Sequence, residues 1–192
     1  MAVDITQFRL NNIIDTCSIW NLLSSKVLYR ATGLAGCSFC CTKFVIYECL
    51  NKPRKSSSPE EDELIERLKI EKNKGMFKEY HLSIEDLQDV DILEKRKNLS
   101  KGELSSIAFA RRISQAFLTD DQGARMLASQ FMDQDMVQTI PQLFGWLMYE
   151  SYLNDSDKDE VINEHESFKR PLKKYFNEIY LKALEMRLLK RE

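Results

Sequence analysis

The sequence of 192 residues contains little glycine and little proline, six and four residues respectively. It contains neither a GxGxxG nor a GxxxxGK string, which excludes the two common glycine-rich loops that hold nucleotide phosphates. No apolar run approaches the roughly 18–20 residues that a membrane helix needs. Residues 1–12 carry Asp4, Gln7 and Arg9 where a signal peptide has an unbroken apolar stretch. We therefore expect a cytoplasmic protein that has no membrane partner.

An excess of positive charge is also missing, because 28 Lys and Arg stand against 30 Asp and Glu, for a formal net charge of -2. A strongly basic nucleic-acid-binding protein is thereby excluded, so any contact with nucleic acid has to come from a local patch. Histidine occurs only at positions 81 and 165, and no local Cys-His or Ser-His-Asp pattern indicates a nucleophile. The five cysteines lie between residues 17 and 49 and lack the second paired motif that a zinc site needs. We expect them to be buried free thiols.

Short apolar segments alternate with segments of helical periodicity along the chain. Strands are predicted at residues 11–14, 38–41, 76–82, 117–119 and 139–140. Helices are predicted at residues 19–33, 43–50, 60–74, 83–93, 100–116, 124–131 and 141–153. Repeated strand-then-helix units are typical of an α/β fold, so we expect a parallel sheet of about four or five strands flanked by helices.

Two parts of the sequence differ from this pattern in their charge. We expect one domain over residues 1–150, with a charged helical insertion at about 51–98, and a helical C-terminal extension over residues 151–192. Residues 155–166 hold six acidic residues and one Lys, which favours a solvated linker or a helix start. Residues 168–192 hold eight basic and three acidic residues, with apolar positions at helical spacing. This basic helix could bind an RNA backbone, but docking on the body or packing in a homo-oligomer is favoured.

Acidic residues recur where the predicted strands end or where the following helices run. Asp15 ends the first strand, and Asp120 and Asp121 end the fourth. Glu48 lies in the second helix and Glu103 opens the fifth. Because the carboxyl ends of parallel strands line one edge of the sheet, carboxylates gathered there need a cation to neutralise them. Mg²⁺ or Mn²⁺ suits such oxygen ligands, and a metal-bound water could attack a phosphodiester.

At these residues the sequence resembles the PIN-domain ribonuclease family. The resemblance is carried by four strings in the order that the family has: IIDTCS at 13–18, VIYECL at 45–50, LSKGE at 99–103 with Ala108 and Ala110, and LTDD at 118–121 with Ala124, Arg125 and Ala128. Together they span roughly residues 11–146. The chain departs from the small members of the family in its longer segment between the second and third strings, and in the 45 or so residues that follow Trp146.

The resemblance implies a PIN-like fold and a metal-dependent endoribonuclease that hydrolyses RNA. It implies a catalytic set of Asp15, Glu48, Glu103 and Asp121. Mg²⁺ or Mn²⁺ would be bound by Asp15, Glu103 and Asp121, with Asp120 as an adjacent candidate ligand, and Ser18 and Thr119 would orient carboxylates or water. Such an enzyme could process RNA, or it could be the toxin of a toxin–antitoxin or defence system that an inhibitory protein partner silences.

Two further points concern the same region of the sequence. The basic turn Lys95, Arg96 and Lys97 lies just before Glu103 and is a candidate for contact with RNA phosphates. Ser100 and Glu103 also form the pattern of a capping box, and Thr119-x-x-Gln122 has a similar pattern, so part of the acidic set could be structural. The alternative function is therefore a catalytically silent PIN-like interaction or RNA-binding module. Cleavage of DNA is a third hypothesis.

Overall fold

A computed structural model describes residues 4–53 and 56–190. Five parallel strands form one sheet in the order β3-β2-β1-β4-β5. The strands are β1 (Asn11–Ile14), β2 (Ser38–Thr42), β3 (Lys78–Tyr80), β4 (Ala116–Leu118) and β5 (Val137–Gln138). The expected α/β fold with a parallel sheet is confirmed.

The strand order places β1 at the centre of the sheet. On β1, Ile13 lies opposite Cys40 of β2 on one side and Phe117 of β4 on the other. The chain first builds outward from β1 to β3 and then returns to build β4 and β5 on the opposite side. The order reverses between β1 and β4, and in open parallel sheets the crevice at the carboxyl ends of such strands is the usual ligand site.

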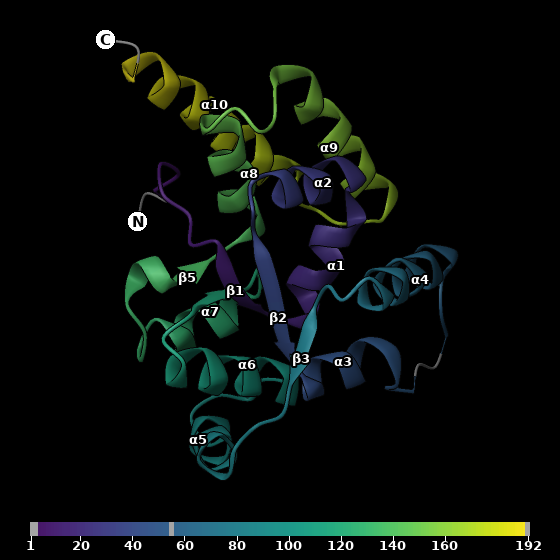
Figure 1. Ribbon diagram of the computed structural model, residues 1–192, viewed down its shortest axis with the longest axis vertical. Helices are drawn as coiled ribbons and strands as arrows, with labels where there is room; N and C mark the ends of the chain where they lie inside the picture. Colours follow the sequence, from purple (N-terminus) through teal and green to yellow (C-terminus); the bar gives the residue numbers. More distant parts are fainter. Residues whose placement is uncertain (1–3, 54–55, 191–192) are drawn as a thin grey trace.

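Ten helices and one short 3-10 helix surround the sheet in the described part of the chain (Figure 1). They are α1 (Thr16–Ser24), α2 (Lys26–Leu34), α3 (Lys43–Leu50), α4 (Pro59–Asn73), α5 (Ile84–Glu94), α6 (Lys101–Arg112), α7 (Gln122–Ala128), the 3-10 helix Gln134–Met136, α8 (Ile140–Tyr149), α9 (Asp155–Ser167) and α10 (Lys173–Leu189).

Alternate residues of the strands point to two hydrophobic clusters, one on each face of the sheet. Ile13 and Phe117 belong to the cluster that α5, α6 and α7 complete. Ile14 and Leu118, their neighbours in sequence, belong to the larger cluster, which includes side chains from α1 to α4 and from α8 to α10. Strands that are apolar on both faces are typical of a sheet covered by helices on both sides.

The predicted insertion and extension both pack on this body. The insertion supplies the edge strand β3, while its helix α4 contacts α1 and its helix α5 contacts α6. The extension is helical, with α9 against α2 and α10 against α8. Val161 and Phe176 of the extension are fully buried in the larger cluster. The extension therefore contributes to the same core as the sheet.

Several predicted boundaries are wrong because side chains cap helices earlier than periodicity suggests. The helix expected over 19–33 is two helices, since Ser25 accepts a hydrogen bond from the backbone N–H of Leu28 and starts α2. The helix expected to reach residue 116 ends at Arg112, and Ala116 already belongs to β4. The last strand lies at 137–138 rather than 139–140, because Thr139 caps α8. Of the two alternatives for residues 155–166, a linker or a helix start, the structure shows the second, because α9 begins at Asp155.

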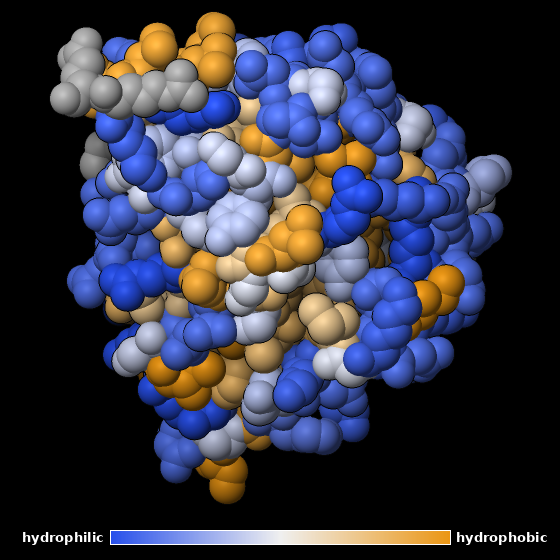
Figure 2. Space-filling model, turned by 45° about the horizontal axis from the view of Figure 1, so that its top comes forward, coloured by the Kyte–Doolittle hydropathy of each residue, from blue (hydrophilic) through white to orange (hydrophobic). Residues whose placement is uncertain are grey.

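No helix among the described residues is both long and apolar enough to cross a membrane. The face drawn in Figure 2 is mostly hydrophilic, with apolar side chains gathered in smaller groups. One such group lies near the end of α10, where Leu188 and Leu189 are exposed.

Candidate active site

Asp15 lies at the switch between β1 and β4 and caps helix α1. Asp15 is fully buried, and one of its carboxylate oxygens accepts a hydrogen bond from the backbone N–H of Ser18 at 2.8 Å. The other accepts the hydroxyl hydrogen of Thr119 at 2.5 Å. Burial raises the pKa of Asp15 to about 7, although these hydrogen bonds act in the opposite direction. A charge at this position is therefore costly unless a cation lies nearby.

Ser18 and Thr119 join the ends of β1 and β4. The Ser18 hydroxyl accepts a hydrogen bond from the backbone N–H of Asp120 at 3.0 Å. The Thr119 hydroxyl, which donates to Asp15, accepts from the backbone N–H of Asp121 at 3.2 Å. Both residues are fully buried. Their hydrogen bonds join the acidic residue that follows β1 to the two that follow β4.

The two neighbouring aspartates after β4 have different partners. Both carboxylate oxygens of Asp120 accept hydrogen bonds, one from the Asn21 side chain at 2.7 Å and one from the backbone N–H of Ile140 at 3.0 Å. Asp120 thereby ties β4 to α1 and α8. Asp121 caps α7 through the backbone N–H of Ala124 at 2.7 Å, with one oxygen. The structure therefore gives Asp120 the more complete set of protein partners and leaves an oxygen of Asp121 without a hydrogen bond to any described residue.

Glu48 is the acidic residue that links α3 to α1 and α6. Its carboxylate accepts hydrogen bonds from the Thr16 hydroxyl at 2.8 Å and the backbone N–H of Gly102 at 2.9 Å. A Cβ atom on Gly102 would lie only 2.4 Å from a Glu48 oxygen. The close approach of the carboxylate to the start of α6 therefore needs glycine at position 102.

Glu103 lies in the first turn of α6, and it does form the predicted capping box. Its carboxylate accepts the backbone N–H of Ser100 at 2.8 Å, while the Ser100 hydroxyl accepts the backbone N–H of Glu103 at 3.2 Å. Burial raises the pKa of Glu103, and the negative charges of Asp121 and Glu48 raise it further. The capping role and the electrostatic contact with the other acidic residues thus exist together.

The acidic residues share one edge of the sheet, but they do not converge on a point. Within residues 4–53 and 56–190, no group of three Asp, Glu, His or Cys side chains is arranged to hold a metal ion. Each carboxylate instead accepts hydrogen bonds from protein donors. The donor set itself is chemically suited to Mg²⁺ or Mn²⁺, because it consists of carboxylate oxygens, the hard ligands that these ions prefer.

Of the three predicted basic residues, Lys97 lies nearest to the acidic edge. Its ammonium donates to the carbonyl of Gly123 at 3.2 Å. A Cβ built on Gly123 would lie within 3.2 Å of both Lys97 Cε and Asp121 Oδ1, so the Lys97 side chain passes beside Asp121. Arg96 instead lies over the ring of Phe131, 5.1 Å from its centre, and Lys95 is exposed at the end of α5.

Arg170 is a neighbour of the site that the sequence analysis did not single out. It belongs to the turn between α9 and α10 and lines a hollow of about 270 Å³ together with Thr16, Glu48 and Lys52. Arg170 lies 122 positions after Glu48 in the sequence (170 minus 48), and only the docking of the extension on α1 and α4 brings them together. Its one local signal was its place in a basic segment.

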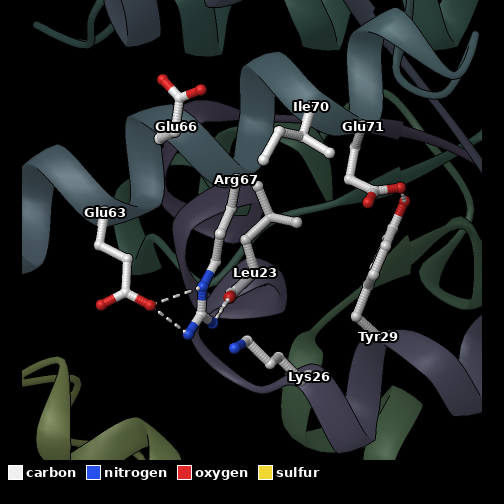
Figure 3. Close-up of a pocket in the computed structure, with 8 residues that line it drawn as sticks. All are labelled: Leu23, Lys26, Tyr29, Glu63, Glu66, Arg67, Ile70 and Glu71. Atoms are coloured by element: carbon white, nitrogen blue, oxygen red, sulfur yellow. Dashed lines mark hydrogen bonds and ion pairs between the residues drawn. The ribbon is translucent and has the colours of Figure 1, made fainter.

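A second hollow, of about 410 Å³, lies between α4 and the helices α1 and α2 (Figure 3). The side chains that line it have a structural role. Arg67 of α4 pairs with Glu63 at 2.7 Å and donates to the carbonyl of Leu23 at 2.6 Å. Tyr29 of α2 donates to Glu71 at 3.0 Å. These contacts hold α4 of the insertion against α1 and α2. The positive charge of Arg67 is neutralised by Glu63 within the hollow.

The cysteines and histidines take no part in the acidic site. The five cysteines lie outside any disulfide, with Cys17 and Cys40 half-buried and the other three buried. Burial and the nearby charge of Asp15 raise the pKa of Cys17 to about 12, so it is a neutral thiol rather than a nucleophile. His165 is buried and bonded to the carbonyl of Val161, whereas His81 is exposed.

Comparison with known proteins adds no identification. No protein-family model matches the chain, and no curated protein matches it.

Proposed function

We propose that the chain is a metal-dependent endoribonuclease that hydrolyses RNA phosphodiester bonds at the carboxyl edge of its sheet. One observation carries the proposal: the Thr119 hydroxyl donates to Asp15 and accepts from the backbone N–H of Asp121, and so joins the acidic residues at the ends of the adjacent strands β1 and β4. The charges of Asp121 and Glu48 also act with burial to raise the pKa of Glu103. Acidic groups from different elements that perturb one another at a ligand-binding edge are typical of functional sites. The resemblance of the same residues to the PIN-domain family supports the same function.

In this proposal Asp15, Glu103 and Asp121 bind Mg²⁺ or Mn²⁺, and Glu48 binds the ion or one of its waters. An ion held there would supply a water of lowered pKa and would neutralise charge on the phosphate. The protein fixes the acceptors in advance, because Thr119 and the Ser18 backbone hold Asp15. The passage of Lys97 beside Asp121 makes it the best placed of the basic residues to contact an RNA phosphate.

The experiment compares substitutions that keep each capping bond and remove only the charge. Glu103→Gln keeps the acceptor for Ser100, and Asp121→Asn keeps the acceptor for Ala124. We expect both variants to keep the wild-type melting temperature and to lose cleavage of a fluorescent RNA oligonucleotide in Mn²⁺ by about a hundredfold or more. Asp120→Asn is the matched control for the adjacent carboxylate, and we expect it to retain more activity than Asp121→Asn.

Calorimetry with Mn²⁺ gives a second measurement that does not depend on the choice of RNA. We expect wild-type protein to bind the ion and Asp15→Asn to bind it at least tenfold more weakly. Full RNA cleavage in excess chelator, or full cleavage by Asp15→Asn, would contradict the proposal.

A catalytically silent module is the second candidate, and a specific observation favours it. In the described chain every acidic residue of the site accepts a hydrogen bond from the protein, and no three of them are arranged around a metal position. In that case RNA would bind without being cut, and neither Mn²⁺ binding nor cleavage would be detected.

The biological setting is a further part of the proposal. A toxin of a toxin–antitoxin or defence system would carry the same acidic edge as a processing enzyme, covered by an inhibitory protein until release. We expect a toxin to arrest growth when it is expressed, and Glu103→Gln to abolish that arrest. Normal growth with the active protein would favour the processing enzyme.

A further inference from the structure

We propose that Arg170 and Lys52 bind a phosphodiester group of the RNA chain in the hollow beside Glu48. This inference rests on the proposed function for the identity of its ligand. It extends that function by assigning a substrate-binding residue to the C-terminal extension, in a position that none of the four PIN-like strings contains.

The charges in the hollow carry the first step of the argument. The carboxylates of Glu48 and Glu61, which line it, already accept hydrogen bonds: Glu48 from Thr16 and Gly102, and Glu61 from the backbone N–H of Ser58. Arg170 and Lys52 form no ion pair within 4 Å among the residues that the structure describes. Glu61 contributes a nearby negative charge to Arg170 without forming an ion pair with it. Both cations therefore remain able to bind an anion directly.

The guanidinium of Arg170 shows the same shortage of partners at the level of single atoms. Its Nε atom is buried and has no hydrogen-bond acceptor in the described chain. Burial lowers the pKa of Arg170, but arginine remains protonated in proteins. A buried donor on a charged group is costly when it is unpaired, and an acceptor with several oxygens, such as a phosphate, would remove that cost. In contrast, the Nε atom of Arg67 in α4 does have an acceptor, because it and a terminal nitrogen both donate to the carboxylate of Glu63 (Figure 3).

The turn that carries Arg170 is held in place on both sides. Phe168 lies under the guanidinium of Arg67, 4.6 Å from the centre of its ring, and Lys169 pairs with Glu60 at 2.7 Å. The backbone N–H of Arg170 itself donates to the carbonyl of His165 at 2.9 Å. The residue is therefore preorganised, and binding an anion there loses little conformational entropy.

The size and surroundings of the hollow favour a phosphate within a chain over a terminal one. About 270 Å³ equals roughly nine waters at about 30 Å³ each, enough for a phosphate and part of its hydration. Lys52 and Glu48 also line a third hollow, of about 680 Å³, where Tyr47 is half exposed. A polymer whose phosphate lies between Arg170 and Lys52 thus has room for its next nucleotide, and an exposed aromatic ring for a base to stack on.

Binding of RNA without metal tests this proposal separately from catalysis. Fluorescence anisotropy in chelator would measure binding of a short single-stranded RNA to wild-type protein and to Arg170→Gln, Arg170→Lys, Lys52→Gln and Lys190→Gln. Lys190 lies at the other end of α10, where it pairs with Glu150, and serves as the control for the loss of one positive charge. We expect Arg170→Gln to bind about tenfold more weakly, Arg170→Lys to recover part of the loss, Lys52→Gln to bind more weakly than wild type, and Lys190→Gln to bind within twofold of wild type. The slope of log affinity against log salt should fall by about 0.7 in Arg170→Gln, which a purely structural role of Arg170 would not produce.

Three ligands separate the possible sources of the phosphate. The same RNA with a 5′-phosphate and with a 5′-hydroxyl should lose equal affinity in Arg170→Gln if the site binds an internal phosphodiester. A loss confined to the phosphorylated RNA would overturn the internal assignment, as would competition by inorganic phosphate at the affinity of the RNA. Unchanged affinity and salt slope in both Arg170→Gln and Arg170→Lys would overturn the subsite altogether.

The outcomes also distinguish this inference from the proposed function. If wild-type protein cleaves RNA while Arg170→Gln has wild-type kcat and KM, the subsite is wrong and the nuclease stands. If no cleavage occurs but binding depends on Arg170, the nuclease is wrong and the subsite stands as part of an RNA-binding module.

Discussion

At the scale of single residues, every side chain of the acidic edge has a structural partner, and burial raises the pKa of three of them, Asp15, Glu103 and Asp120. Asp15 illustrates both, because it caps α1 and contacts Thr119 while burial raises its pKa to about 7. Such a residue lowers the stability of the protein in its ionised form, a cost that suggests selection for something other than stability. The sequence predicts its position after β1, but the hydrogen bonds to Ser18 and Thr119 follow only from the fold.

Asp15→Asn should change the pH dependence of stability. Because the pKa of Asp15 in the folded protein is above its unfolded value of 3.8, the folded state loses stability as pH rises from about 4 to about 7 and stays lower above that range. Without metal, the variant should be more stable than wild type by up to about 4 kcal/mol near pH 8 and equal to it below about pH 4. Urea unfolding across this range, in chelator, measures the difference. Parallel curves for the two proteins would contradict the buried, ionisable state of Asp15.

Gly102→Ala tests the close approach of Glu48 to α6. The added Cβ would lie 2.4 Å from a Glu48 oxygen, so the carboxylate has to move away from the backbone N–H of residue 102. Alanine is also the better helix former by about 1 kcal/mol, so stability should change little while cleavage falls by about a hundredfold. Gly33→Ala is the control, because nothing lies within 4 Å of its Cβ position. Equal activity of the two variants would show that the position of Glu48 does not matter.

At the scale of elements, the ends of helices explain both where sequence reasoning succeeds and where it fails. The strand at 11–14 and the start of a helix at residue 43 are predicted because apolar runs and helical periodicity are local signals. The division between α1 and α2 is missed because apolar positions continue across Ser25, the local cap of α2. Part of the support for this helix start also comes from α9, whose Glu164 accepts hydrogen bonds from the Ser25 hydroxyl and from the backbone N–H groups of Lys26 and Val27. Acceptors supplied by another helix leave no pattern near the helix that they support.

Glu164→Ala should therefore destabilise α2 although position 164 lies in another helix. The substitution removes a charged acceptor from three donors at the N-terminus of α2, and we expect a loss of about 1–2 kcal/mol. Glu160→Ala, at an exposed position one turn earlier on α9, should change stability by less than about 0.5 kcal/mol. Denaturant unfolding compares the two variants, and equal losses would show that the cap contributes nothing.

At the scale of the whole molecule, the C-terminal extension and the sheet form one packed unit. Gly145 of α8 marks the closest approach, since a Cβ there would lie 2.2 Å from Ile179 of α10 and 3.0 Å from Ile5. The amphipathic pattern of 168–192 predicts a docked helix, but not which face of the body receives it. Gly145 is the small residue of α8 that allows α10 to approach this face, and its role is visible only once the two helices are in contact.

Gly145→Ala should separate α8 from α10 and destabilise the protein by about 1–3 kcal/mol. If the clash with Ile179 is the cause, Ile179→Ala should offset part of the loss, and a double-mutant cycle should give a favourable coupling of about 1 kcal/mol. Thermal unfolding of the four proteins measures the coupling. Strict additivity of the two substitutions would place the effect elsewhere in α8.

The shared core also has a consequence for the order in which the protein can become active during its synthesis. Phe176 and Ala183 of α10 fill the same cluster as Ile14 and Leu118, the residues next to the acidic edge. A nascent chain that has reached only Tyr149 has all four acidic residues but lacks α9, α10 and the Glu164 acceptor at the start of α2. If the protein cleaves RNA, activity should arise only after α9 and α10 have left the ribosome and docked, which would protect the messenger RNA during its own translation.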